Sequence, residues 1–229
     1  MKACYYLLAR LTLSSLALSS IATAATPPDL SGVWQVSAAV RELKTTDGKA
    51  PPLLPDAQKT YDERRAQLKQ GKASFDTTQR CKPMGQPRIM YDSKDFPFDI
   101  VQTPKKIFIG YQWNRQPRHI YIDENHSGIS PVFYGYSSGR WEGNTLVVQV
   151  VGIDDSTLLD ASGLPHSDAM KLTERYQLKN NGQQLEVRYS FDDPSTFSKN
   201  WDAVVTFNKI PNGRVAEDIC VDRLKLFSK

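Results

Sequence analysis

Residues that bind metals or attack substrates are scarce in this sequence, which holds three histidines and three cysteines. No two cysteines stand in a Cys-x-x-Cys spacing, so neither a zinc site nor a thioredoxin-like redox motif is indicated. His119, His126 and His166 lack the short spacing of known metal-ligand pairs. A Gly-x-Ser-x-Gly nucleophile motif and a glycine-rich phosphate-binding loop are both missing. We therefore predict no metal and no cofactor.

Long apolar runs are also missing after the N-terminus. The opening MKACYYLLARLTLSSLALSSIATA combines early basic residues, an apolar stretch and an Ala-Thr-Ala cleavage pattern, which together indicate a secretory signal peptide. The apolar stretch is short for a membrane span, and no cysteine follows the cleavage site, so we expect no stable membrane anchor. Residues 1–24 are the predicted leader. Residues 25–229 are the predicted single domain, which is exported to the periplasm or secreted.

Charge of one sign does not dominate. Of the 29 Lys and Arg residues, Lys2 and Arg10 leave with the leader, so 27 basic residues face 25 acidic ones. This near balance gives no electrostatic reason to expect nucleic-acid binding. Removing the leader also removes Cys4 and leaves Cys81 and Cys220, which in an oxidising compartment most simply form one structural disulfide. The alternative is two separately buried thiols.

Alternating apolar and polar residues fill most of the chain. Leu185, Val187, Tyr189 and Phe191 share one face of a segment whose other face is polar, which predicts a strand with one buried face. Similar patterns between turn residues predict strands near 29–40, 88–91, 98–103, 106–113, 118–122, 133–141, 145–151, 170–178, 184–192, 202–208 and 215–221. About ten antiparallel strands in sequence order favour an up-and-down barrel, because closure removes exposed edges. A two-sheet sandwich is the alternative.

One helix is predicted near the N-terminus, from Leu54-Pro55-Asp56 to about Gly71. Proline near the start and glycine at the end are typical of helix boundaries. The helix is mostly charged, so we expect it to lie outside the barrel. The predicted disulfide would then connect the segment after this helix to the final predicted strand.

The Gly32-x-Trp34 opening and the run of strands resemble the lipocalin-like barrels. A longer resemblance covers most of the chain after the leader. The segments SSGRWEGNTLVVQVVGIDD, LPHSDAMKLTERY and DDPSTFSKNW are similar to those of a widespread family of exported bacterial proteins of unassigned function. The resemblance implies export and a barrel, and it implies no activity. The chain departs from that family at Asn144, where members often have Asp, and at Lys171, where they often have His.

Glu174 interrupts the apolar face of the predicted strand 170–178. A carboxylate on the core side of a strand is costly to bury without a partner. In an apolar cavity its pKa would rise, which suits proton transfer. Alternatively, Glu174 pairs with an arginine such as Arg118 or Arg140 and fixes the barrel.

His166 and Asp168 lie in the loop before that strand. A histidine beside a carboxylate can be held in one tautomer and act as a general acid or base near neutral pH. Together with Glu174, these two residues form the candidate catalytic set. The alternative is that they cap a turn through hydrogen bonds to the backbone.

Three polar side chains share one face of the predicted strand 133–141: Tyr134, Tyr136 and Arg140. Such a face would hydrogen-bond a phenol, a carboxylate or a carbonyl if it pointed into the barrel. Alternatively it points outward, because a glycine and a tryptophan on the opposite side favour that side as the core. Trp113 and Tyr176 complete the candidate ligand-binding set.

A small barrel can hold one ligand among apolar and aromatic side chains. One predicted function is therefore a periplasmic, cofactor-independent acid–base enzyme of the isomerase, lyase, hydratase or cyclase type, acting on a small hydrophobic or aromatic molecule. The alternative is a non-catalytic carrier or binding protein for the same class of molecule. The enzyme needs His166 and Glu174 to reach one cavity, whereas the carrier needs only the cavity. A structural protein of the cell envelope, the third class, would have a filled barrel. The sequence does not set the oligomeric state.

Overall fold

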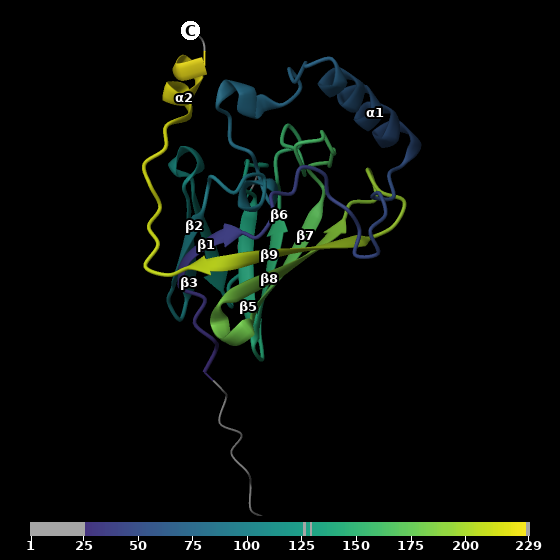
Figure 1. Ribbon diagram of the computed structural model, residues 1–229. Helices are drawn as coiled ribbons and strands as arrows, with labels where there is room; N and C mark the ends of the chain where they lie inside the picture. The colour runs from purple at the N-terminus through teal and green to yellow at the C-terminus, as the bar shows by residue number, and fades with distance from the viewer. Residues whose placement is uncertain (1–25, 126, 129, 228–229) are drawn as a thin grey trace, which may run out of the picture.

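Strands close into a barrel in the computed structural model, which describes residues 26–125, 127–128 and 130–227 (Figure 1). The prediction of a β-barrel is confirmed, whereas the predicted leader 1–24 and His126 lie outside the described residues. The strands of this barrel are β1 (Gly32–Val36), β2 (Phe98–Gln102), β3 (Lys106–Tyr111), β4 (Pro117–Ile122), β5 (Tyr136–Glu142), β6 (Thr145–Val151), β7 (Lys171–Lys179), β8 (Gln184–Asp192) and β9 (Trp201–Ile210).

The strands follow one another around the barrel in sequence order, and every pair of neighbours is antiparallel except β4 and β5. Strand direction can alternate around a closed ring only when the number of strands is even, so the nine described strands require one parallel pair. The predicted antiparallel barrel of about ten strands is therefore matched in part: the described strands number nine, and one neighbouring pair is parallel. A parallel pair cannot be joined by a tight turn, so β4 and β5 require a longer connection than the neighbouring hairpins do.

Alternation along the strands puts large side chains into the barrel. Trp34, Tyr189, Phe191 and Phe207 are fully buried, and β8 alternates between buried and more exposed residues along its whole length. The rings of Phe98 and Phe207 meet edge to face, with their centroids 5.2 Å apart. The interior is therefore a packed core for most of its length.

The predicted N-terminal helix is confirmed as α1 (Pro55–Lys69), which lies outside the barrel, at the upper right of Figure 1. Pro55 occupies its first turn, and Tyr61 is its buried residue. The Tyr61 hydroxyl lies 2.6 Å from the Ser162 hydroxyl, which connects the helix to the loop between β6 and β7. Among the described residues, no helix has the length and apolar content needed to cross a membrane.

The predicted strand 88–91 is wrong, because this segment forms the 3-10 helix η2 (Arg88–Met90). Arg88 is buried and donates to both Asp92 and Asp76, at 2.9 Å and 2.8 Å, which favours a helical turn over an extended segment. Met90 and Tyr91 then point into the upper end of the barrel, where the Met90 sulfur contacts the hydroxyls of two core tyrosines. The upper end is thereby filled.

The predicted strand 215–221 is also wrong. Because β9 already pairs with β1, the barrel offers no free edge to another strand, and the chain runs as an irregular segment into α2 (Cys220–Phe227). The predicted disulfide is confirmed between Cys81 and Cys220, whose Cα atoms lie 5.6 Å apart. It connects the segment after η1 (Thr77–Arg80) to the start of α2, instead of to a final strand.

Candidate functional site

Glu174 lies inside the barrel and is fully buried, as the strand pattern predicted. Its partner is Arg118, which reaches from β4 to β7 and donates from Nη2 to Oε2 at 2.7 Å and from Nη1 to Oε1 at 3.2 Å. Both side chains are almost completely excluded from solvent. Of the two arginines considered from the sequence, Arg118 makes this pair, and Arg140 lies outside the barrel.

Further hydrogen bonds surround this ion pair. The Tyr176 hydroxyl donates to Glu174 Oε2 at 2.9 Å, and Arg118 Nε donates to the Ser137 hydroxyl at 3.0 Å. Burial lowers the pKa of Arg118, but the adjacent Glu174 carboxylate outweighs this and raises the pKa well above its usual value. Burial, and then the same carboxylate, raises the pKa of Tyr176 well above its usual value. Arg118 and Glu174 therefore form a buried ion pair in which both carboxylate oxygens accept hydrogen bonds.

Two buried polar atoms near this cluster lack a partner. Gln86 Nε2 donates to the Tyr111 hydroxyl at 2.5 Å, but Gln86 Oε1 accepts no hydrogen bond from the described residues. The Tyr134 ring stacks on Tyr111 at a centroid distance of 6.1 Å, and its buried hydroxyl also has no partner in the described part of the chain. Burial raises the pKa of Tyr111 to about 12.

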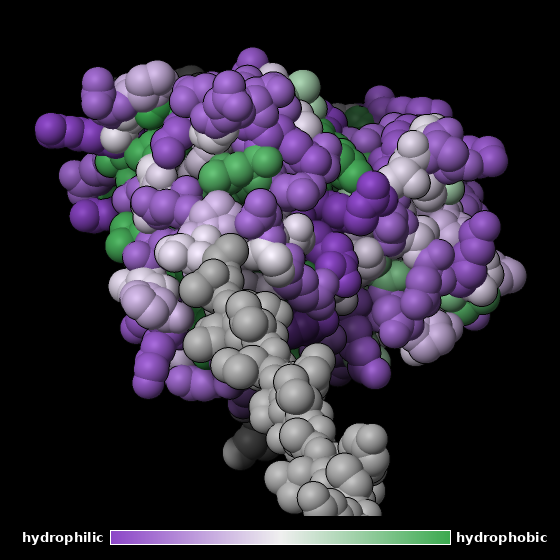
Figure 2. Space-filling view, turned by 90° about the horizontal axis from the view of Figure 1, so that it is seen from below, coloured by the Kyte–Doolittle hydropathy of each residue, from purple (hydrophilic) through white to green (hydrophobic). Residues whose placement is uncertain are grey.

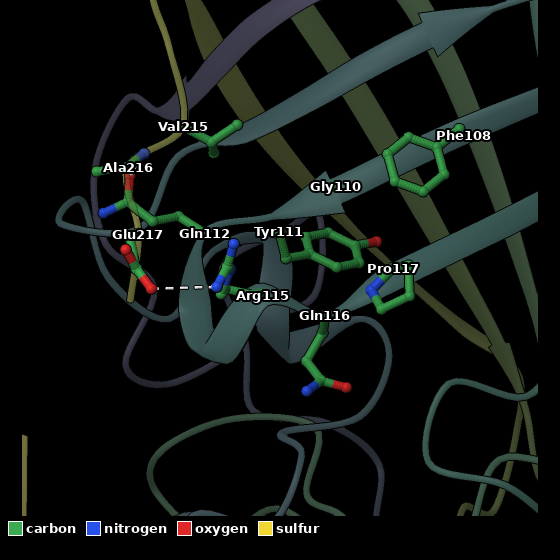
Figure 3. Close-up of a pocket in the computed structure, with 10 residues that line it drawn as sticks. All are labelled: Phe108, Gly110, Tyr111, Gln112, Arg115, Gln116, Pro117, Val215, Ala216 and Glu217. Atoms are coloured by element: carbon green, nitrogen blue, oxygen red, sulfur yellow. Dashed lines mark hydrogen bonds and ion pairs between the residues drawn. The ribbon is translucent and has the colours of Figure 1, made fainter. Parts of the chain in front are cut away.

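Tyr111 also lines a pocket of about 250 Å³ at the upper rim of the barrel, between the β3–β4 hairpin and residues 215–217 (Figure 3). Arg115 and Glu217 form an ion pair across this pocket, with 3.1 Å between Arg115 Nη1 and Glu217 Oε1. Both side chains are exposed, so the ion pair contributes little stability. The pocket is too small for a drug-sized ligand.

His166 is buried in the loop between β6 and β7. Its Nδ1 lies 2.9 Å from the Ser167 carbonyl oxygen, so Nδ1 carries a proton, and its Nε2 lies 2.9 Å from the Thr157 hydroxyl. Burial lowers the pKa of His166, and nearby carboxylates such as Asp193 only partly offset this effect. Asp168 is exposed, and the carboxylate that binds this part of the loop is that of the buried Asp193, which follows β8 and accepts two hydrogen bonds from Ser167.

The remaining predicted ligand-binding residues lie apart from one another. Tyr136 is on the outer face of β5, where its hydroxyl donates to the Ser130 carbonyl oxygen. Arg140 is also on the outer face and pairs with Glu142. Trp113 is buried in the turn η3 (Trp113–Arg115), beneath the guanidinium of Arg223. The alternative that the Tyr136–Arg140 face points outward is therefore the observed one.

A larger pocket, of about 860 Å³, lies at the opposite, lower end of the barrel, and we call it the basal pocket. Figure 2 views the molecule from this end, where hydrophobic side chains show between hydrophilic ones. It is bounded by the segment before β1, the β2–β3 turn, the end of β4 and the end of β5, through Thr26, Pro27, Asp29, Ser31, Gln102, Thr103, Pro104, Ile122, Asp123, Trp141 and Gly143.

The parallel β4–β5 pair accounts for the position of the basal pocket. The last paired residues of these strands are Ile122 and Gly139, after which β4 ends while β5 continues through Trp141. The chain turns away at Asp123, which adopts a positive φ of 58° and donates its backbone N–H to the Gly139 carbonyl oxygen. Trp141 is therefore left at the rim without a neighbouring β4 residue. A tryptophan directly before a tight turn was the available sequence signal, but the candidate set did not include it.

No protein-family model matches this chain, and no curated protein matches it. No group of three or more His, Cys, Asp or Glu side chains within the described ranges is arranged to hold a metal ion. The candidate sites are therefore the buried Arg118–Glu174 cluster and the basal pocket, and they differ in access. The cluster is closed to solvent, whereas the basal pocket is open on one side.

Proposed function

We propose that this protein is an exported, non-catalytic binding protein that holds a small hydrophobic or aromatic molecule in its basal pocket. The observation that carries the proposal is the pocket itself. Its volume of about 860 Å³ lies within the range of small-molecule sites, and Trp141, Ile122 and two prolines give it apolar walls. Export is supported by the Cys81–Cys220 disulfide, because such bonds persist in oxidising compartments such as the periplasm.

A cofactor-independent acid–base enzyme is the second candidate. One observation favours it, because buried titratable groups with shifted pKa values, such as Tyr176 beside Glu174, are common at active sites. The hydrogen bonds of Glu174 make the enzyme the less favoured of the two candidate functions. Arg118 and Tyr176 occupy both oxygens of its carboxylate, so this group cannot exchange a proton with a substrate unless the pair separates.

Native mass spectrometry of the protein purified from its own cell envelope tests the binding proposal. We expect a small apolar molecule that stays bound in the gas phase and is released by denaturation. Turnover of that molecule by the native protein, lost on Glu174→Gln, would favour the enzyme instead. Recovery of ligand-free protein that also binds no apolar probe would contradict both functions.

Two matched variants test whether the ligand binds in the basal pocket. Trp141→Ala removes the largest apolar wall, so we expect at least about tenfold weaker binding by isothermal titration calorimetry. Val204→Ala is the control, because Val204 is an exposed apolar residue on the outer face of β9 and does not line the basal pocket. Equal affinities of the two variants would place the ligand elsewhere.

A further inference from the structure

The basal pocket is acidic. Among the described residues that line it are two carboxylates, Asp29 and Asp123, and no lysine, arginine or histidine. Asp29 accepts a hydrogen bond from the Ser31 backbone N–H at 2.9 Å. Hydrogen bonds from Ser31 lower the pKa of Asp29, and the charge of Lys209 lowers it further, so Asp29 is ionised at neutral pH.

Lys209 does not neutralise the pocket. Its ammonium group lies over the Trp34 ring, 5.3 Å from the centroid, and the residue is absent from the pocket lining. Its effect on Asp29 is the smallest of those that act on that carboxyl group. The basic residue whose charge acts on Asp29 therefore lies outside the lining of the basal pocket.

Asp123 is the second acidic group, and its carboxylate is open to a partner. The residue is exposed, and within the described part of the chain its carboxylate makes no hydrogen bond or ion pair. Its backbone position is fixed by the bond to Gly139 at the end of β4, so the carboxylate stays at the rim that Trp141 occupies. A ligand would meet this negative charge beside an aromatic wall.

Trp141 adds a second attraction for a cation. The face of an aromatic ring carries partial negative charge, and tryptophan binds ammonium groups more strongly than tyrosine or phenylalanine does. Ile122, Pro27 and Pro104 supply the apolar part of the same wall. The pocket therefore combines walls for an apolar body with two carboxylates and an indole for a positive charge.

We propose that the ligand of the basal pocket is a hydrophobic cation, an amine or quaternary ammonium carried on an aromatic or aliphatic body. This inference rests on the proposed binding function and adds the charge of the ligand to it. The attraction is modest because the pocket is open to water, so we expect a cation to bind about three- to tenfold more tightly than a neutral molecule of the same shape. The preference falls as salt is added.

The test compares matched probes on the protein exported with its own leader. Naphthylmethylamine, its trimethylammonium analogue, naphthylmethanol and naphthoate share one apolar body and differ in charge, and calorimetry at low salt and neutral pH gives each affinity. Phenyl and decyl series repeat the comparison for bodies of other shapes. We expect both cations to bind most tightly and the carboxylate least tightly. Asp123→Asn and Asp29→Asn should each lower the ratio of the amine affinity to the alcohol affinity.

Asp168→Asn is the matched control, because Asp168 is exposed in the loop between β6 and β7 and does not line the basal pocket. It should change no affinity. If the alcohol or the carboxylate binds as tightly as the amine, the charge inference is overturned and the binding proposal stands. If no probe of any series binds, the binding proposal is overturned and the charge inference falls with it.

Discussion

At the scale of single residues, the cost of burying charge decides what Glu174 can do. Moving a carboxylate and a guanidinium out of water costs several kcal/mol for each ion, and their attraction offsets this only with good geometry. Here Arg118 supplies two hydrogen bonds to the carboxylate, and Tyr176 and Ser137 supply one further bond each to the pair. The attraction and hydrogen bonds of the pair therefore offset the cost of burying it. Removal of one charged member should strongly destabilise the fold.

Glu174→Gln should destabilise the fold by about 3–5 kcal/mol, because it leaves the Arg118 guanidinium buried without a counter-charge. Urea denaturation followed by tryptophan fluorescence measures this loss. Glu186→Gln is the control, since Glu186 pairs with Lys179 at 3.5 Å on the surface, and its removal should cost less than about 1 kcal/mol.

The double variant Arg118→Met with Glu174→Leu completes this test. Apolar residues of similar volume replace the pair, so stability should return to within about 1–2 kcal/mol of the wild type or exceed it. If Glu174→Gln is as stable as the wild type, the pair does not carry the charge that the structure assigns to it.

The inward position of Glu174 followed from alternation, because a strand sends every second side chain to the same face. The choice of Arg118 over Arg140 did not, because it depends on which face of β5 points into the barrel. The sequence also could not identify Asp193 as the carboxylate that binds the His166 loop. Asp193 follows β8 and is 26 residues from Ser167 in sequence, whereas Asp168 is adjacent and was the natural candidate.

At the scale of elements, hydrophobic pattern located every strand of the barrel, but two segments with strand-like composition were not strands. The segment 88–91 has three consecutive buried residues after Arg88, and consecutive burial differs from the alternation of a half-buried strand. The segment 215–221 contains Val215, Ile219 and Val221, which are residue types common in strands, but the closed barrel has no edge for it. Strand number, and with it the parallel pair and the basal pocket, follows from closure and is not encoded in any one segment.

The prediction at the scale of elements concerns the C-terminal segment. The Cys81–Cys220 bond joins residues 139 apart in sequence, so Cys81→Ser with Cys220→Ser should lower the free energy of unfolding by about 2–5 kcal/mol. The barrel should survive, because neither cysteine lies in a strand, and the far-UV circular dichroism spectrum should be unchanged.

Trypsin reports the local effect of the same variant. Arg214 is exposed in the irregular segment before α2, and we expect faster cleavage there when the segment loses its covalent attachment. Reducing agent should reproduce the change in the wild type and have no effect on the double variant. Unchanged cleavage at Arg214 together with loss of the strand spectrum would show that the bond holds the barrel instead of its C-terminal segment.

At the scale of the whole molecule, buried titratable groups limit stability at both ends of the pH range. Burial raises the pKa values of Tyr91, Tyr176 and Tyr189 well above the usual value, so stability is lost above about pH 10, where only the unfolded phenols ionise. In acid, the protonation of two buried carboxyl groups changes the free energy of unfolding in opposite directions. Hydrogen bonds and charge from Arg88 leave the pKa of Asp76 lowered despite burial, whereas burial raises the pKa of Asp160.

Between these limits, His166 should set the pH dependence of stability. Burial lowers the pKa of its imidazole, so as the pH falls through about 6.5 the unfolded state binds a proton that the folded state does not. The free energy of unfolding therefore decreases towards acid, with a slope that approaches about 1.4 kcal/mol per pH unit. Urea denaturation at intervals from about pH 7.5 to 5.5 measures this slope above the range of the carboxyl groups.

His166→Asn should flatten the slope whatever its effect on overall stability, because asparagine does not titrate. His119→Asn should retain the slope, since His119 is exposed on the outer face of β4. A wild-type stability that is constant across this interval would show that the folded loop takes up the proton as readily as the unfolded chain. The Thr157 and Ser167 contacts would then not hold His166 in its neutral form, and the loop over the upper end of the barrel would open to solvent at neutral pH.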